Sequence, residues 1–253
     1  MATAECPHCG GSGWKTVETD GLSGAERCEC FFEHRSQRIE ERACIPPNYE
    51  NASFDNFMLP QDNHIARRSL ADSLVIVRSY TREFPHGDKP GLLFLGDPGT
   101  GKTHLAVAAM RSLIARGFEG LFYDYQGLLE RIRSSYDSAS QISDKAAYRN
   151  ALDAEILLLD DLGAQRITDW TEDTVTSIIT HRCNNKKPLI ATTNLIDPDA
   201  GGVVIERTPG SGKVDYKITL AERIGARARS RLFEMCRIVR MPQVQDYRVK
   251  TSR

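Results

Sequence analysis

The sequence of 253 residues has no long hydrophobic run, no recognisable leader and almost no net charge. No apolar stretch approaches the roughly 20 residues of a membrane-spanning helix, so we expect no membrane association. The first residues, MATAECPHCGG, lack the basic start and apolar centre of a secretory signal peptide, and we therefore expect a cytoplasmic location. The formal net charge of −1 excludes a protein that is basic overall, so any DNA contact must come from a local basic patch.

The most specific pattern lies in residues 91–107, GLLFLGDPGTGKTHLAV. The apolar residues 92–95 are typical of a short buried parallel strand, and HLAVAAMRSLIA is typical of an amphipathic helix. The loop between them fits G-x-x-x-x-G-K-[ST] in full. Because the N–H groups of such a loop cradle phosphates at a helix N-terminus, we expect an ATP site here. Its residues are Gly96, Asp97, Pro98, Gly99, Thr100, Gly101, Lys102, Thr103 and His104.

A second apolar strand is predicted in residues 155–163, EILLLDDLG, and it ends in two acids. At the carboxyl edge of a parallel sheet, these acids lie beside the phosphate loop. We expect Asp160 and the Thr103 hydroxyl to hold Mg²⁺, with Lys102 reaching the β- and γ-phosphates. Asp161 stands where a glutamate usually polarises the attacking water, and its shorter side chain predicts a slow ATPase.

A third strand is predicted in residues 188–194, PLIATTN. A polar residue at the end of this strand can reach the γ-phosphate or the attacking water. We assign that role to Asn194, with Thr193 as its neighbour.

Four of the seven cysteines lie in the first thirty residues, as a C-x-x-C pair and a C-x-C pair. In a reducing compartment such clustering indicates a metal before it indicates disulfides. We expect a structural Zn²⁺ site, because two close pairs suit tetrahedral coordination by four thiolates. Its ligands are Cys6, Cys9, Cys28 and Cys30, with His8 and His34 as alternatives. The segment between the pairs predicts two short strands around Asp20-Gly21, with so small a core that metal binding would supply most of its folding energy.

The C-terminal part combines a glycine-rich insert at residues 199–218 with a basic helix. The insert predicts a hairpin or a flexible segment. Arg223, Arg227 and Arg231 recur every four residues and are expected on one helix face. Such a face is either solvated or directs an arginine onto the γ-phosphate of a neighbouring subunit. Arg248 is placed to reach the phosphates of its own subunit.

Taken in order, these motifs resemble the DnaC/IstB branch of AAA+ ATPases, over about residues 45–253. The resemblance rests on IPPNYENASFDNF, GDPGTGKTHLA, LLLLDDLG, ATTNL, SRLFEMC and DYR. It implies an α/β fold of RecA-like type, a three-layer α/β/α arrangement with parallel strand order 5-1-4-3-2 and a reduced C-terminal lid. It also implies ATP bound between subunits of a spiral homo-oligomer, with Arg231 as the arginine finger, Arg227 as a secondary candidate and Arg248 as a sensor arginine. We expect residues 1–44 to form a zinc-binding module with a linker helix, and residues 45–253 to form the ATPase domain.

The resemblance further implies an ATP-dependent loader that places the replicative DnaB-type helicase on single-stranded DNA. The alternative is an IstB-like transposition helper that coats DNA and recruits a transposase. A third possibility is a nucleotide-gated DNA-binding adaptor with negligible hydrolysis. The residues that match the DNA-facing region of the family are Arg133, Tyr136 and Trp170. The expected cofactors are ATP, Mg²⁺ and Zn²⁺.

Overall fold

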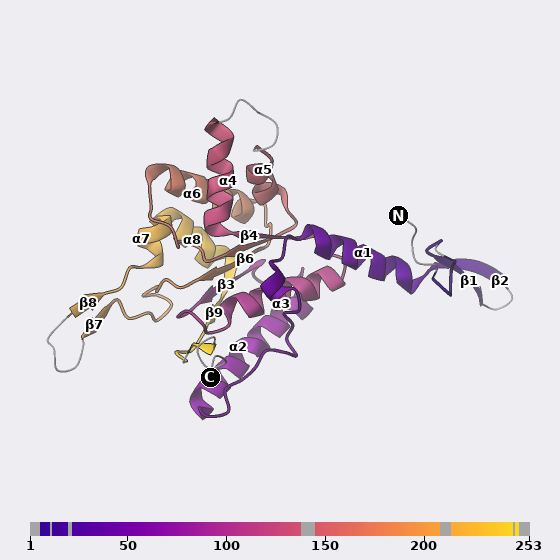
Figure 1. Cartoon of the computed structure of the whole chain (residues 1–253), viewed down its shortest axis with the longest axis horizontal. Coiled ribbons are helices and arrows are strands. Elements are labelled where there is room, and N and C mark those ends of the chain that lie inside the picture. Colours follow the sequence, from indigo (N-terminus) through magenta and orange to yellow (C-terminus); the bar gives the residue numbers. More distant parts are fainter. Residues whose placement is uncertain are drawn as a thin grey trace.

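The computed structural model describes residues 6–10, 12–19, 22–137, 145–207, 214–244 and 246–247. Its centre is a sheet of five strands in the order β4-β5-β6-β3-β9 (Figure 1). The strands are β3 (Gly91–Leu95), β4 (Gly120–Asp124), β5 (Ile156–Asp160), β6 (Leu189–Thr193) and β9 (Cys236–Arg240). Neighbouring strands pair in parallel throughout. Numbered along the chain within this sheet alone, the strands run 5-1-4-3-2, so the predicted order is confirmed.

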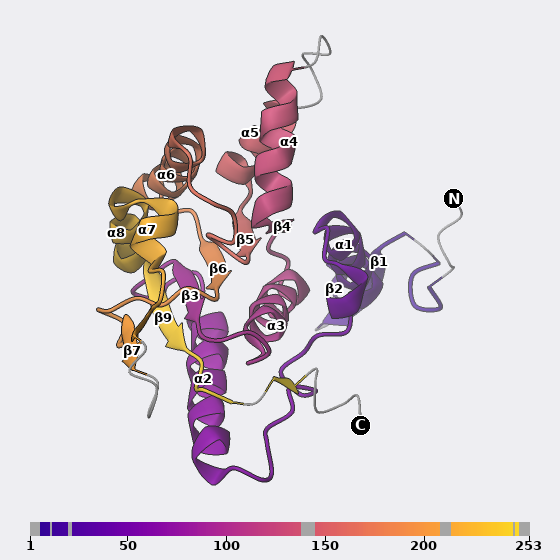
Figure 2. The same ribbon diagram turned by 60° about the vertical axis from the view of Figure 1, so that its left-hand side comes forward.

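Helices cover both faces of the sheet, and Figures 1 and 2 show these two layers from different sides. One layer holds α1 (Glu29–Arg42), α2 (His64–Glu83) and α3 (Lys102–Ala115). The other holds α4 (Tyr125–Asp137), α5 (Lys145–Asp153), α6 (Asp169–Asn184), α7 (Leu220–Ile224) and α8 (Ala226–Met235). Side chains alternate along each strand, so Leu92 and Phe94 pack toward α2 and α3 while Leu93 and Leu95 pack toward the other layer. The predicted three-layer α/β/α fold is confirmed.

An antiparallel hairpin, β1 (Trp14–Thr19) with β2 (Leu22–Arg27), stands away from the sheet at the far end of α1 (Figures 1 and 2). Its strands follow the prediction, although the turn residues 20 and 21 lie outside the described part of the chain. The other end of α1 is anchored, because Ile39 and Ala43 are buried in the core under α3. A short 3-10 turn, η1 (Pro47–Tyr49), follows. The boundary between residues 44 and 45 stays a prediction.

The insert after β6 contains a second antiparallel hairpin, β7 (Ile205–Arg207) with β8 (Val214–Tyr216). It projects from the side of the molecule opposite to β1 and β2 (Figure 1). The hairpin interpretation of the insert is therefore confirmed in the described residues.

One expectation about the basic helix is wrong. Gly225 has a φ of 84° and divides the segment into α7 and α8. Arg223 therefore does not continue the face formed by Arg227 and Arg231. A Cβ at Gly225 would lie 2.3 Å from Glu172 Oε1, so close packing against α6 accompanies the break. Among the described helices, none is long and apolar enough to cross a membrane.

Candidate functional site

The loop between β3 and α3 has the backbone of a phosphate cradle. Gly99 and Gly101 have φ values of 74° and 88°, in the left-handed region that favours glycine. Gly101 caps the N-terminus of α3, and this helix begins at Lys102. The loop thus presents N–H groups at a helix N-terminus, where the helix dipole favours an anion.

Lys102 is buried against the loop that contains it. Its Nζ donates to the Asp97 carbonyl at 2.8 Å, and the Thr100 hydroxyl donates to the same oxygen at 2.9 Å. The exposed fraction of Lys102 is only 5%, so its positive charge lies inside the site rather than in solvent. A buried cation at the N-terminus of a helix is suited to bind a polyphosphate.

A pocket of about 810 Å³ opens over this loop. That volume suits a nucleotide, since small-molecule sites span about 300–1,000 Å³. Of the loop residues, Pro98 to His104 line the pocket, and Asp161 and Asn194 line it from the ends of β5 and β6. Gly96 and Asp97 form the start of the loop, where a Cβ at Gly96 would lie 2.7 Å from the Met241 side chain. The predicted loop, Asp161 and Asn194 therefore meet in one place.

Much of the pocket wall comes from residues that the sequence did not assign to the site. They are Asn48, Tyr49, Asn56, Phe57, Met58, Leu59, Pro60, Gln61, Asp62, Asn63, Ala66, Leu70, Val244 and Tyr247. The Phe57 ring lies 5.6 Å from that of His104 between centroids. The His104 Nε2 is 2.9 Å from the Ser53 carbonyl oxygen, so this histidine joins α3 to the segment before α2.

The C-terminal segment also touches the phosphate loop. The Tyr247 N–H donates to the Gly99 carbonyl at 3.3 Å. A Cβ at Gly99 would lie 2.1 Å from Asp246 Oδ1, so only glycine allows this close approach. Arg248, the predicted sensor arginine, lies outside the described residues.

The two acids at the end of β5 have different surroundings. Asp160 is buried, and the Thr192 hydroxyl donates to its Oδ1 at 2.6 Å. Burial raises the pKa of Asp160, hydrogen bonds from Thr192 and Thr103 oppose this, and the charge of Asp161 adds to it. An acid beside the threonine that follows the phosphate-loop lysine has the donor chemistry for Mg²⁺.

Asp161 is held in an unusual backbone conformation with a φ of 54°. Its N–H donates to the Thr192 hydroxyl at 3.0 Å, and the Asn194 amide donates to its Oδ1 at 3.1 Å. These contacts aim the carboxylate into the pocket beside Asn194. Aspartate tolerates the left-handed region better than most side chains, which gives a backbone reason for its presence here.

The predicted arginine finger does not belong to the pocket of its own chain. Of the described residues, the pocket lining includes Lys102 and His104 but no arginine. Arg231 lies on α8 and forms an ion pair with Glu234 at 2.6 Å, with 44% of its side chain exposed. Arg227, one turn earlier on α8, is exposed. Neither arginine lines the described pocket.

The three DNA candidates lie on two helices, α4 and α6. Arg133 is exposed on α4, and Tyr136 lies near the end of the same helix with its side chain outside the description. Trp170 is only partly buried and packs against the core on the α6 side of the sheet. This packing indicates that Trp170 contributes to the stability of the fold.

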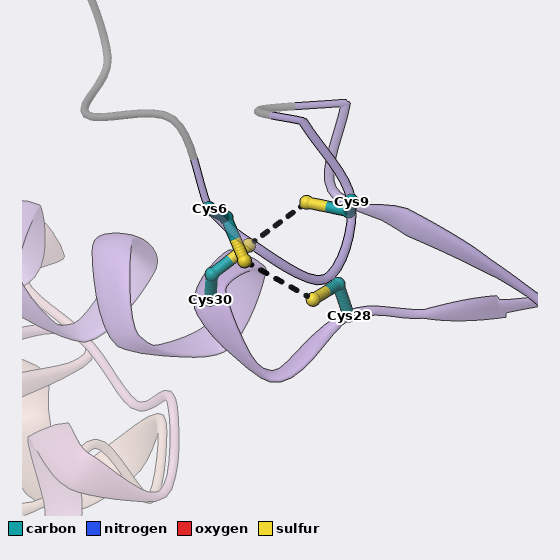
Figure 3. Close-up of side chains that lie close together, drawn as sticks. All are labelled: Cys6, Cys9, Cys28 and Cys30. Carbon is teal, nitrogen blue, oxygen red and sulfur yellow. Dashed lines mark hydrogen bonds between the residues drawn. The ribbon is translucent and has the colours of Figure 1, made fainter.

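The four predicted zinc ligands converge (Figure 3). Their sulfur atoms all lie within 4.8 Å of one another, with Cys6 Sγ 3.7 Å from Cys28 Sγ and Cys9 Sγ 3.3 Å from Cys30 Sγ. The Gly13 N–H donates to Cys9 Sγ at 3.3 Å, as N–H groups do around metal-bound thiolates. Four thiols at this spacing fit one tetrahedral Zn²⁺. His8 is exposed and outside the cluster, and the side chain of His34 lies outside the description.

Comparison with known sequences gives a consistent result. A family model described as IstB-like ATP binding protein matches residues 81–206. The replicative helicase loader DnaC of Escherichia coli (strain K12) is 27% identical over 160 residues, which are 63% of this chain and 62% of that protein. The match thus spans less than two thirds of the length of this curated relative.

Comparison with solved structures extends the match. A crystal structure of the DnaC helicase loader aligns over 78% of this chain and 100% of that chain, with 30% identity and a TM-score of 0.61. AMPPCP-bound DnaA from Aquifex aeolicus aligns over 82% of this chain and 54% of that one, with 19% identity and a TM-score of 0.51. The second likeness shows a shared fold alone.

Proposed function

Because the chain belongs to the IstB/DnaC-like family of ATP-binding proteins, we propose that it is an ATP-dependent loader of a replicative DnaB-type helicase onto single-stranded DNA. The observation that carries the proposal is the 30% identity to a DnaC helicase loader across the whole of that solved chain. The nucleotide pocket supports it, because a loader needs a site that changes with the state of ATP. Family membership makes the chain a P-loop ATP-binding protein.

We assign the following roles within the pocket. The N–H groups of the loop and Lys102 bind the β- and γ-phosphates, and Thr103 and Asp160 hold Mg²⁺, whose charge offsets that of the phosphates. Asp161 orients and deprotonates the attacking water. The Asn194 amide, already bonded to Asp161, reads the γ-phosphate and the water together.

Hydrolysis is proposed to be slow, as in a switch. The Asp161 carboxylate is one methylene shorter than glutamate and has to reach the water from a left-handed backbone position. Asp161→Glu tests this by steady-state ATP turnover without any partner. A rise in turnover supports the proposal, whereas fast turnover in the wild type that Asp161→Glu leaves unchanged contradicts it.

The pocket is proposed to be completed by a second copy of the chain. Arg231 of the neighbouring subunit supplies the arginine that the described pocket lining lacks, with Arg227 as the secondary candidate, and Arg248 acts within its own subunit. ATP would then drive head-to-tail association into a spiral homo-oligomer. Single-stranded DNA would contact its inner surface, with Arg133, Tyr136 and Trp170 as candidate residues.

The cysteine cluster is proposed to hold one structural Zn²⁺. The hairpin of β1 and β2 has few buried side chains of its own, so the metal would be the main source of its stability. Its position at the far end of α1 makes it accessible to a protein partner or to DNA (Figure 1).

The decisive experiment is a pull-down with the full chain, in ATP and in a slowly hydrolysed analogue, followed by identification of the retained proteins. A hexameric helicase retained only with nucleotide supports loading, and Lys102→Ala should abolish its retention. If the wild type binds ATP but retains no helicase under either condition, the loader proposal is wrong.

A transposition helper is the second candidate, because the matching family model is described as IstB-like. In that case the ATP-bound oligomer would coat duplex DNA and retain a transposase in the same pull-down. The DNA-binding adaptor without hydrolysis would be favoured if Lys102→Ala abolished DNA binding while Asp161→Asn had no effect in cells.

A further inference from the structure

A buried ion pair joins the loop after β6 to α8. The Asp197 side chain is only 2% exposed, and it accepts from Arg229 Nε at 2.8 Å and from a terminal Arg229 nitrogen at 2.5 Å. Asp199 accepts from Arg229 at 2.6 Å as a second acid. Such a two-point contact fixes distance and orientation together.

Arg229 is therefore unlike the other arginines of α8. Its guanidinium lies 4.0 Å over the Phe233 ring, and its side chain is 20% exposed. Hydrogen bonds to Asp197 and Asp199 raise the pKa of Arg229 above its ordinary value. It is committed to its own chain, whereas Arg227 is exposed and Arg231 is 44% exposed.

The loop that Arg229 binds begins at Asn194, the predicted γ-phosphate sensor. Asn194 bonds to Asp161, and Asp197 follows three residues later. The Asp197 carboxylate also accepts from the Asp199 N–H at 3.1 Å, so the loop is folded around it. The Leu220 N–H donates to the Ile196 carbonyl at 2.9 Å, which ties the loop to the start of α7.

The helix on the other side of the pair needs such a fixed point. α8 starts directly after the break at Gly225, so no continuous helix sets its direction from α7. Arg227 and Arg231 lie two residues before and two residues after Arg229. Whatever fixes Arg229 also fixes the helix that carries both candidate finger arginines.

We propose that Arg229 is a positioning residue that holds α8 against the loop after Asn194 through its contact with Asp197. This contact fixes the position of the finger arginines, which face the neighbouring subunit, relative to the γ-phosphate sensor of their own subunit. This inference rests on the proposed ATP-dependent oligomer. It adds a link between the nucleotide site of one subunit and the residues that it offers to the next.

The first test compares Arg229→Lys and Asp197→Asn with the wild type in the full chain. Lysine keeps the charge but cannot make the two-point contact. We expect ATP affinity within about twofold of wild type and turnover at least about tenfold lower, so that kcat falls while KM is nearly unchanged. Asp199→Asn is the matched control, because that carboxylate is 75% exposed and should change turnover by less than about twofold.

The second test asks which subunit is affected. Arg229→Lys subunits keep a complete pocket, and Asp161→Asn subunits keep a complete α8 but an inactive pocket. Mixing these two impaired variants should raise turnover above that of either alone, because each mixed interface of the right polarity combines an intact pocket with a correctly placed α8. Arg231→Ala mixed with Asp161→Asn should recover in the same way.

Three results would overturn the inference. Turnover of Arg229→Lys at the wild-type level shows that the contact is not needed. A drop that mixing does not rescue shows that Arg229 acts on its own pocket. A lowered melting temperature together with weakened ATP binding shows a purely structural role. If instead the wild type itself neither assembles nor hydrolyses ATP, the proposed function has failed before this inference is tested.

Discussion

Asp160 illustrates at the residue scale how a functional site opposes stability. The carboxylate is buried, accepts a hydrogen bond from the Thr192 hydroxyl and lies near the charge of Asp161. Burial raises its pKa. Because the folded-state pKa lies above the unfolded one, the folded chain binds this proton more readily. Stability from this group is therefore present at low pH and is lost as the pH rises through the folded-state pKa.

We predict that Asp160→Asn lowers ATP turnover by roughly 100-fold or more, because the amide is a poor Mg²⁺ ligand. Without nucleotide or magnesium, the variant should melt at or above the wild-type temperature near neutral pH. The advantage should shrink as the pH is lowered and the wild-type carboxyl gains its proton, which its raised pKa favours. Thermal melts over a series of pH values measure this, and a large loss of stability in the variant near neutral pH would contradict it.

The sequence located the residues of the phosphate loop, Asp161 and Asn194 because each sits at a fixed offset from a strand end, and the pocket confirms that they meet. It did not locate most of the opposite wall. Tyr49 and Tyr247 lie far apart in the chain, and Tyr49 ends the three-residue 3-10 turn η1, which is too short for any periodicity to mark it. The left-handed backbone of Asp161 was equally invisible, since it depends on the Thr192 contact from another strand.

At the scale of elements, Arg182 holds three segments together. This arginine of α6 is fully buried and donates to carbonyl oxygens of Ala151, Leu152, Ala154, Glu155 and Pro188. These oxygens belong to the end of α5 and to the residues directly before β5 and β6. Burial lowers the pKa of Arg182 to about 10, so it remains charged at neutral pH.

We predict that Arg182→Met destabilises the protein by roughly 3 kcal/mol or more, because methionine fills the space but leaves several buried carbonyls without a donor. Lys187→Met is the matched control: its amine bonds one carbonyl, that of Asp153, and should cost under about 1 kcal/mol. Urea unfolding of both variants gives the comparison. Equal midpoints for the two would refute the assignment.

The strands around the nucleotide loop were predictable because each is a short apolar run with a polar end. The break at Gly225 was not, since the spacing of Arg223, Arg227 and Arg231 is compatible with one continuous helix. Its cause is tertiary: a close approach to Glu172 of α6 and a left-handed glycine. β9 follows α8 directly and was implied by the family resemblance, not by its own residues.

At the scale of the whole molecule, we expect the folding of the N-terminal hairpin to depend on zinc in the cysteine cluster. We predict about one zinc per chain by elemental analysis. Chelation or Cys30→Ser should unfold the hairpin of β1 and β2, seen as lost strand signal and faster proteolysis before residue 29. ATP affinity should stay within about twofold of the untreated chain, because the hairpin stands away from the central sheet at the far end of α1 (Figure 1). Cys44→Ser is the control, since that cysteine is exposed and outside the cluster.

The division of the chain after residue 44 also has a measurable consequence. Ile39 and Ala43 are buried against the ATPase core, and Glu40 pairs with Arg111 of α3 at 2.5 Å. A chain that starts at residue 45 should therefore melt several degrees below one that starts at residue 36. Equal melting temperatures would show that the helix adds nothing to the domain and that the predicted boundary is a true one.

The anchoring of α1 at one end gives the molecule a lever. Its 14 residues span about 21 Å at 1.5 Å per residue, from a fulcrum on α3 to the hairpin at the tip. A tilt of about 10° at the fulcrum would sweep the tip through roughly 4 Å. α3 itself starts at the phosphate loop. A small shift of α3 around the nucleotide would therefore become a displacement of about one atomic diameter at the hairpin, where a partner would bind.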